Sequence, residues 1–423
     1  MKKVKLKEIL EVKRGTSLSG KYYSDTGDKI RLTLGNFDYP GGGFKENTAK
    51  SDIYFTGEVK PQFILKKGDI ITPLTEQVSG LLGETAIIPE DNKYIQSGDI
   101  GLVIPNPKEL DSRFAYYLIS SSIIKKQLDV SSQQTKIRHT SPEKIMDCIA
   151  WIPELKIQRK IAKFLDLINE KIKNNSKINN NLEELMKTIY QRWFIEFEFP
   201  NEEGKPYKSN GGKLVYNEEL KYRIPKKWKV DNCYDTNMFE IIKPGVQWFE
   251  IKNYLATGNV EGNNITDGVY VGYDNRESRA NMQPLPNSIW FAKMKNSIKH
   301  ITLSSNSEWF NEKYILSTGF LGIKCKEDTL CYLHCFIYSD YFEKVKDMLA
   351  HGATQEAINN EDLKAIKLIV PDKRVLKLFE NYTKAIIQDE LDVIHENQRL
   401  DSLKEFILPL LMNGQINVDD IEI

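Results

Sequence analysis

The sequence lacks an excess of charge, a long apolar run and a cysteine framework. Its 423 residues include 59 lysines and arginines against 59 aspartates and glutamates, so the chain as a whole has no attraction for nucleic acid or anionic lipid. No apolar run approaches the roughly 20 residues that cross a bilayer, and the first residues form no signal-peptide core. The five cysteines form no Cys-x-x-Cys pair, which favours a reducing compartment. We therefore expect a soluble, cytoplasmic protein that does not bind membranes.

Motifs for catalysis are also missing. The chain has no Gly-x-x-x-x-Gly-Lys-Ser/Thr loop for ATP and no Gly-x-Gly turn placed after a predicted strand for a cofactor. It has no Pro-Pro pair of the kind that amino-methyltransferases use to hold a flipped base. Glu154-Leu155-Lys156 matches one fragment of a nuclease motif, but a glutamate there also suits a helix start. We predict a chain without catalytic residues and without a cofactor.

A small cluster of metal-binding residue types stands in the second half. Cys331, His334 and Cys335 lie close together, with Cys325 nearby. A zinc site would need two well-spaced ligand pairs. A half-buried helix over 332–342, with cysteines as small apolar residues, explains the pattern better. We therefore predict no metal site.

Two parts of the chain repeat the same order of features. Each has a polar stretch around a glutamine, a short apolar run, a proline and a long helical pattern. The first copy comprises residues 132–137, 145–152, Pro153 and 154–196, and the second comprises residues 353–358, 363–370, Pro371 and 372–412. Weaker matches keep a similar offset, namely Gly35-Asn36-Phe37 with Gly258-Asn259-Val260, and 96–101 with 317–322. A repeat of this length indicates two related domains rather than a solenoid of small units.

The segment before the first long helix predicts a mixed α/β domain. Asp111 is a candidate N-cap for a helix over 112–128. Other predicted elements are strands at 30–34, 85–88 and 100–104, a hairpin at 63–72 with its turn at Lys67-Gly68-Asp69, and a glycine-rich loop at 39–43. The composition of 200–228 is that of a linker, and a second α/β domain is expected after it.

Two long helices are predicted, over 154–196 and 372–412. Apolar residues alternate at spacings of three and four in both, which is the seam of a coiled coil. Neither helix can bury its stripe alone, so we predict that the two pack antiparallel on each other. Asn175 and Asn179 fall in the middle of the first seam; the asparagines could instead mark a break between two shorter helices. The apolar seam positions are Ile161, Leu165, Ile168, Ile172, Leu182, Met186, Ile189 and Trp193 in the first helix, and Phe379, Tyr382, Ile386, Val393, Leu400, Leu403, Ile407 and Leu410 in the second.

Several motifs around the long helices carry a family resemblance. They are Ile152-Pro153-Glu154-Leu155 with Gln158, Ile161 and Ala162, then residues 167–172, 179–185 and 193–199, together with 66–71 and Ala353-Thr354-Gln355. This set resembles the specificity subunit of type I restriction-modification systems. The resemblance covers the full length, because the twofold plan is itself the family's plan. The second copy departs from the pattern, since residues 371–374 lack the glutamine seen at 158.

The resemblance implies an α+β fold with two similar target-recognition domains, at 1–152 and 200–371, and two long antiparallel helices, at 153–199 and 372–423. It implies a DNA-binding subunit without catalytic activity, in which each domain reads one half of a split target on double-stranded DNA. The helices would set the spacing and dock two methyltransferase subunits. Restriction–translocase subunits would complete the assembly.

Base reading needs amide and guanidinium groups on loops that reach the major groove. The glutamines near 134 and 355 are favoured because they recur at equivalent places, although a glutamine could equally cap the loop before the next strand. Arg276 and Arg279 flank Glu277, which is also typical of a solvated loop. The candidates are Lys13, Arg14, Lys45, Thr75, Gln77, Gln133, Gln134, Lys136, Arg138 and His139 in the first domain, and Asn275, Arg276, Arg279, Lys293, Lys295, Asn296, Lys299, His300 and Gln355 in the second.

Other interpretations stay open at this point. The aromatic run 193–199 could stack on a base, but its position at the end of a helix favours packing or a partner contact. The chain could be an enzyme of the nuclease or methyltransferase class, which would need a cofactor motif that we do not find. It could also be a coiled-coil adaptor that binds no DNA, or the specificity module of another DNA-modifying enzyme.

Overall fold

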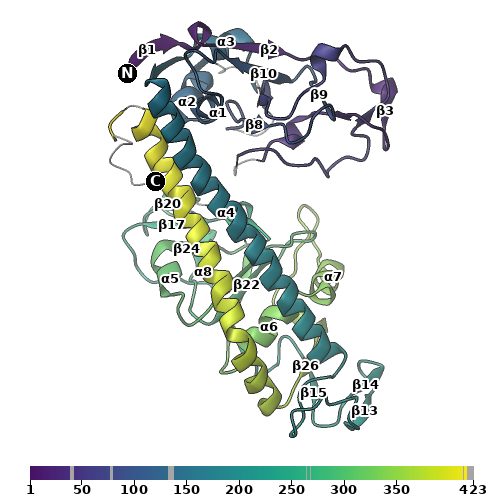
Figure 1. The fold of residues 1–423 in the computed structure, drawn as a ribbon. Helices are drawn as coiled ribbons and strands as arrows, with labels where there is room; N and C mark the ends of the chain where they lie inside the picture. Colours follow the sequence, from purple (N-terminus) through teal and green to yellow (C-terminus); the bar gives the residue numbers. More distant parts are fainter. Residues whose placement is uncertain are drawn as a thin grey trace. The chain divides into compact units, whose positions relative to one another are not determined.

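The computed structural model describes residues 1–38, 42–76, 80–131, 138–262, 264–266, 268–412 and 414–416. It divides into two compact units: Met1–Lys171 with Leu400–Ile423, and Ile172–Arg399. Both units mix helices and strands, as predicted (Figure 1). Among the described residues, no helix combines the length and the apolar character needed to cross a membrane.

Short strands and helices make up the first unit. They are β1 (Lys2–Lys5), β2 (Leu10–Arg14), β3 (Tyr23–Ser24), β4 (Ile30–Arg31), β5 (Tyr54–Phe55), β6 (Ile70–Pro73), β7 (Thr75–Glu76), β8 (Ala86–Ile87), β9 (Tyr94–Ile95), β10 (Ile100–Pro105), α1 (Ser112–Ile119), α2 (Ser122–Ser131), β11 (Arg138–His139), α3 (Pro142–Asp147) and β12 (Ile149–Ile152). One sheet has the order β2–β10–β6–β8 and another the order β3–β5–β4–β9, while β1 pairs with β12 and β7 with β11. Residues 85–88 and 100–104 therefore contain strands, as predicted.

Strand β6 is buried at every position. Ile70 packs in a core with the helices, together with Phe114 and Leu118. Its neighbour Ile71 packs in a different core, with Leu32, which follows β4. Successive side chains of a strand point to opposite faces, so β6 is covered on both sides.

Three local predictions in this unit need correction. Asp111 does cap α1 and accepts the N–H groups of Arg113 at 3.0 Å and Phe114 at 3.2 Å. The helix expected over 112–128 is nevertheless two helices, because Ser121 after α1 turns its hydroxyl back to the Leu118 carbonyl at 2.6 Å. The strand expected at 30–34 ends at Arg31, and a 3-10 helix follows at Leu34–Asn36.

The predicted hairpin at 63–72 is the third correction. Its turn and its second strand, β6, form as expected. The residues before the turn begin with a 3-10 helix, Pro61–Phe63. They then run beside β9, where the Leu65 N–H donates to the Tyr94 carbonyl at 2.9 Å. The first arm thus belongs to the other sheet, a non-local pairing that local alternation could not reveal. The predicted loop at 39–43 falls partly outside the described residues.

The second unit repeats this plan. Its elements are β13 (Leu214–Asn217), β14 (Tyr222–Pro225), β15 (Lys229–Asn232), β16 (Phe239–Ile241), β17 (Lys252–Leu255), β18 (Val260–Glu261), β19 (Asn264–Ile265), β20 (Val269–Val271), β21 (Ala280–Met282), β22 (Ser288–Ala292), β23 (His300–Leu303), α5 (Glu308–Lys313), β24 (Tyr314–Ser317), β25 (Phe320–Cys325), α6 (Leu330–Ile337), α7 (Asp340–Leu349) and β26 (Lys367–Val370). The sheet β16–β25–β22–β23 matches β2–β10–β6–β8, and the pair β15–β26 matches β1–β12. The parallel pair β17–β24 matches β4–β9. Residues 214–225, predicted as linker, form the hairpin β13–β14.

The weak Gly-Asn repeat seen in the sequence marks one shared turn. In the first unit, the Asn36 side-chain oxygen accepts the N–H of Thr33 at 2.9 Å. In the second, the Asn259 oxygen accepts the N–H of Ala256 at 3.0 Å. A 3-10 helix ends at each asparagine, and a buried Phe37 or Val260 follows. The predicted correspondence between these segments is confirmed.

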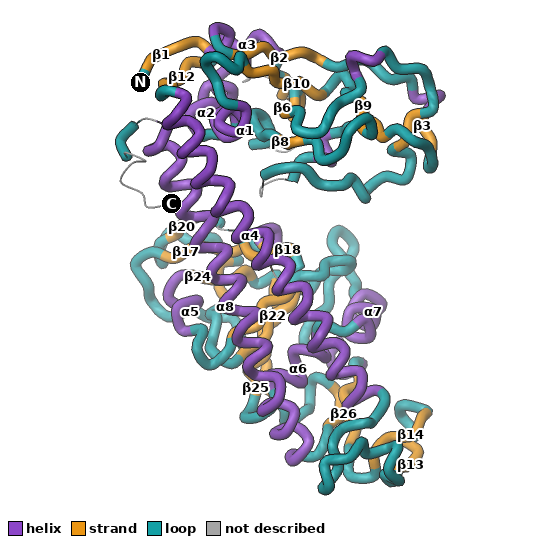
Figure 2. The backbone as a smooth tube through the Cα atoms, in the orientation of Figure 1, coloured by secondary structure: helices purple, strands orange, loops and turns teal. Residues whose placement is uncertain are grey.

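Two long helices run antiparallel. They are α4 (Leu155–Tyr190), which continues into a π-helical turn at Gln191–Ile195, and α8 (Lys373–Met412); Figure 2 shows both as unbroken helices. In the first unit Lys404 donates to the Asn169 side-chain oxygen at 3.3 Å. In the second unit the Asn175 amide donates to Glu396 at 2.7 Å and to Asn397 at 2.9 Å. The asparagines therefore lie within a continuous helix, as predicted, and the alternative of a break between two shorter helices is wrong.

The seam predicted for α4 is buried or half-buried at every position. The seam predicted for α8 is partly wrong. Six of its eight apolar positions are buried or half-buried, but Tyr382 is 64% exposed and Leu403 is also exposed. The buried face of α8 also includes the polar residues Thr383 and Glu390, which the apolar pattern could not indicate.

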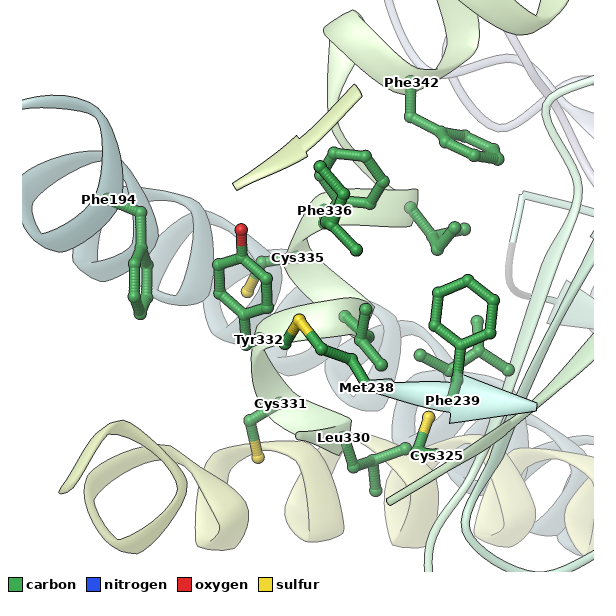
Figure 3. Close-up of a cluster of buried hydrophobic side chains, with 14 of the residues drawn as sticks. Phe194, Met238, Phe239, Cys325, Leu330, Cys331, Tyr332, Cys335, Phe336 and Phe342 are labelled. Carbon is green, nitrogen blue, oxygen red and sulfur yellow. The ribbon is translucent and has the colours of Figure 1, made fainter. Parts of the chain in front are cut away.

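The cysteines of the second unit are core residues. Helix α6 is buried along its whole length, not half-buried, and it ends before Tyr338, so the helix predicted over 332–342 is two helices. Figure 3 shows Cys331 and Cys335 among Tyr332 and Phe336 in the hydrophobic cluster. Burial raises the pKa of both thiols. No group of potential metal ligands occurs among the residues that the structure describes.

Gly322 is expected to be essential for this fold. A Cβ there would lie 2.4 Å from the ring of fully buried Trp290, and the two residues are paired across β22 and β25. Gly322→Ala should therefore destabilise the second unit by about 2 kcal/mol and lower the melting temperature by roughly 4–8 °C. Gly258→Ala is the control, because a Cβ at Gly258 meets nothing within 4 Å. Equal melting temperatures for the two variants would contradict this packing.

Candidate nucleic-acid interface

A polar hollow of about 590 Å³ opens in the first unit. It gathers ends of strands from both sheets, since Arg14 ends β2 and Arg31 ends β4. The lining also includes Thr33, Asn47, Lys50, Thr75, Ser97 and Asp99. Three cations against one carboxylate give this hollow a positive character, which suits a phosphate or the acceptor edge of a base.

The two arginines of the hollow are held differently. Arg31 is buried, donates to the Asp52 carboxylate at 3.1 Å and lies 3.8 Å from the Tyr23 ring centre. Among the described residues, Arg14 makes long contacts with the carbonyls of Gly98, at 3.4 Å, and Thr140, at 3.5 Å. Arg31 therefore forms the floor, while the exposed guanidinium of Arg14 keeps donors for a ligand.

The loop beside the hollow is closely packed. A Cβ on Gly35 would lie 2.8 Å from the side chain of Asn47, and the Asn47 amide donates to the Thr33 hydroxyl at 2.8 Å. Sequence reasoning missed Thr33 and Asn47, as well as Arg31 and Lys50. The available signal was the repeated Gly35-Asn36 motif, which marks the same loop.

The remaining candidates of the first unit are scattered. Thr75 and Arg14 share the hollow, although Thr75 is largely buried. Lys13 pairs with Glu11 at 3.2 Å, and Lys45 with Asp38 at 3.8 Å, both on the surface. His139 is exposed on β11, which pairs with β7 at Thr75. Four candidates lie outside the described residues, namely Gln77, Gln133, Gln134 and Lys136. A fifth, Arg138 on β11, is described by its backbone alone.

Near the hollow, the residue that follows the central strand β6 hydrogen-bonds through its backbone to two distant segments. The second unit repeats this arrangement, which we call the crossing. In the first unit the Leu74 N–H donates to the backbone carbonyl of Asp99 at 2.8 Å. The Leu74 carbonyl accepts from the backbone N–H of Thr140 at 2.9 Å. In the second unit Lys293 makes the same two bonds, to the carbonyl of Gly319 and from the N–H of Ile358, each at 3.0 Å. The crossing brings the chain after each glutamine segment to the end of the central sheet.

Lysines collect at this crossing in the second unit. Lys293 is half-buried, and its desolvation lowers the pKa of its ammonium group. Lys295 pairs with Glu356 at 2.8 Å, and Gln355 is exposed beside Met294. The structure thus brings three predicted residues together: Lys293, Lys295 and Gln355.

Other candidates of the second unit are engaged in the fold. His300 is buried and its Nε2 lies 2.8 Å from the Glu343 carboxylate, so the prediction that it touches DNA is not supported by its position. Lys299 donates to the Thr257 carbonyl at 2.6 Å. Arg276 folds onto Tyr273, with 4.0 Å between its guanidinium carbon and the ring centre.

Two exposed loop candidates and the aromatic run complete the set. The Asn275 side-chain oxygen accepts the Gly272 N–H at 2.7 Å, while Arg279 is exposed. In the aromatic run, Trp193 and Phe194 are buried, and Phe194 packs 4.8 Å from Phe379 between ring centres. The packing interpretation of this run is confirmed.

Residues 1–184 match the family described as type I restriction modification DNA specificity domain. The first 184 residues are therefore similar to a type I DNA specificity domain. It is 23% identical over 327 residues to the type I restriction enzyme MjaIX specificity subunit of Methanocaldococcus jannaschii, covering 73% of this chain and 70% of the relative. It is 19% identical over 406 residues to the HindI specificity subunit of Haemophilus influenzae, covering 83% and 87%.

A solved structure of similar fold supports the architecture. The crystal structure of the type I restriction-modification S subunit from M. genitalium matches with a TM-score of 0.52 at 15% identity, over 97% of this chain and 96% of that one. At such low identity the likeness concerns the fold. It confirms the predicted α+β class with two domains and two long helices.

Arg14 is expected to contact DNA as the most available cation of the hollow. Arg14→Ala should weaken binding of target DNA about tenfold, because one charged contact is typically worth 1–3 kcal/mol, roughly a factor of ten or more. The measurement is fluorescence anisotropy at fixed salt, using the chain with its methyltransferase partner. Lys108→Ala is the matched control, since exposed Lys108 does not line the hollow. Equal affinities for both variants would exclude Arg14 from the interface.

Proposed function

We propose that this chain is a specificity subunit that reads a split target on double-stranded DNA, with recognition domains at 1–152 and 200–371 each reading one half. The observation that carries the proposal is the repeat of one fold, including the crossing at Leu74 and Lys293. Each copy presents polar and basic side chains beside that crossing. Two modest half-site contacts on one chain bind far more tightly than either alone when their spacing matches.

We propose further that the helices at 153–199 and 372–423 set this spacing and dock two methyltransferase subunits, to which restriction–translocase subunits add. Support comes from apolar side chains that the helix pair leaves exposed. On α8 these are Tyr382, Leu403 and Phe406, and on α4 they are Leu167, Ile178 and Leu185. Exposed apolar side chains gathered on a helix are typical of a surface that a partner covers, and a partner helix can supply that cover.

Sequencing of methylated DNA tests the function directly. The chain would be co-expressed with a type I methyltransferase subunit, and methylated sites would be mapped across the host genome. We expect one motif of two short, different sequences separated by a fixed unspecified gap. A contiguous motif would indicate a different kind of specificity module. Co-purification without any motif-specific methylation would favour the adaptor alternative.

The docking surface predicts a second result. Phe406 is 69% exposed on α8, so Phe406→Asp should leave the melting temperature within about 2 °C while reducing methyltransferase co-purification at least tenfold. Ser402→Asp adds the same charge at a nearby exposed position and should retain the partner. Loss of the partner in both variants, or in neither, would remove the support for this surface.

A further inference from the structure

The loop between β22 and β23 is fastened to helix α7. This loop, residues 293–299, contains Lys293, Lys295 and Lys299 of the candidate interface. The Lys346 ammonium on α7 donates to the Ser297 carbonyl at 3.0 Å. The adjacent Asp347 carboxylate accepts the Asn296 N–H at 3.0 Å.

The lysine of this fastening is out of contact with water. The Lys346 side chain is 0% exposed and lies 2.6 Å from the Glu343 carboxylate. The other oxygen of Glu343 lies 2.8 Å from His300, which begins β23. Burial alone would raise the pKa of Glu343, but hydrogen bonds from His300 and Lys346 outweigh burial and lower it. The cluster therefore contains a carboxylate held between two donors.

Such a cluster fixes the geometry of the loop more than it adds to the free energy of folding. Desolvation of buried charges can offset their attraction, so apolar residues of similar volume would often stabilise the fold as well. A buried lysine with a carbonyl and a carboxylate nevertheless accepts only one arrangement of its partners. That arrangement fixes where the loop leaves β22 and enters β23.

A second anchor holds the other side of the loop. The Lys295 N–H donates to the Glu356 carbonyl at 3.0 Å, and its ammonium pairs with the Glu356 carboxylate at 2.8 Å. Asn296 adopts a left-handed conformation with φ of 54°, which asparagine tolerates better than most residues. The loop is thus tied both to α7 and to the segment that carries Gln355.

The first unit has an ion pair in the corresponding place. Lys125 on α2, the counterpart of α7, pairs with Glu84, which lies just before β8. The Glu84 side chain is nearly inaccessible to solvent. Both units therefore join the second helix of the helical pair to the hairpin of the central sheet through a buried charge, although the residues differ.

We propose that Lys346 and Glu343, with His300, are positioning residues that hold loop 293–299 in the shape that reads the second half of the DNA target. This inference rests on the proposed function. None of the three side chains needs to touch DNA. Their role is to limit the conformations of Lys293, Lys295 and Lys299, so that fewer conformations are lost on binding.

Hydrogen exchange on the full chain tests the positioning without DNA. Lys346→Met keeps the length of the side chain and removes its charge, while Lys344→Met changes an exposed lysine of the same helix. We expect amides 294–299 to exchange at least tenfold faster in Lys346→Met, with rates in β25 unchanged, and no change in Lys344→Met. Unchanged loop rates, or equal acceleration throughout the second unit, would overturn the proposal.

A milder variant keeps the test decisive if Lys346→Met does not fold. Asp347→Ala removes only the partly exposed acceptor of the Asn296 N–H. We expect faster hydrogen exchange at the Asn296 amide alone. Unchanged exchange at that amide would overturn the proposal.

Mapped methylation then tests the consequence for DNA reading. Lys346→Met, or Asp347→Ala in its place, should relax the sequence requirement in one half of the methylated motif and leave the other half intact. Relaxation of both halves, or of neither, would overturn the role of these residues in DNA reading. If the wild type gives no split motif while loop exchange responds as expected, the proposed function fails and the positioning of the loop stands.

Discussion

The antiparallel pairing of α4 and α8 is the constraint on which the structure depends. Each helix is amphipathic and would expose its apolar stripe to water if it stood alone. Asn175 is buried in the seam and donates to both Glu396 and Asn397. A buried asparagine stabilises a seam less than leucine does, but only one register satisfies its hydrogen bonds. The register of the two helices therefore follows from a few polar side chains rather than from the apolar stripe.

Each long helix also holds the start of a shorter helix, one in each unit, and the two units use different residues for this contact. Gln158 at the start of α4 is buried, accepts the Asp111 N–H at 2.8 Å and donates to the carbonyls of Glu109 and Pro153, each at 2.9 Å. The second copy lacks this glutamine. There, Glu380 of α8 accepts the Cys331 N–H at the start of α6, at 3.0 Å. The missing glutamine is thus replaced by a carboxylate one turn later that holds the corresponding helix.

Sequence reasoning succeeded where periodicity and repetition were strong, as in the α4 seam and the shared turn at Asn36 and Asn259. It was only partly right for α8, where the buried face includes the polar residues Thr383 and Glu390. It failed for the hairpin before β6, whose first arm pairs with a distant strand. For the interface it named Arg14 and Lys293, which lie beside the crossing, and their contact with DNA stays a prediction. It could not find Arg31, because the hollow forms only when two sheets meet, nor foresee that His300 is buried by α7.

The central claim is that the helix pair sets the distance between two reading domains. Inserting one heptad at matching positions of α4 and α8 would preserve the seam and lengthen each helix by about 10 Å, or roughly three base pairs of DNA. The decisive measurement is the methylated motif of this variant, mapped beside that of the wild type. The account predicts unchanged half-sites separated by a gap about three base pairs longer. An unchanged gap, with methylation retained, would contradict it.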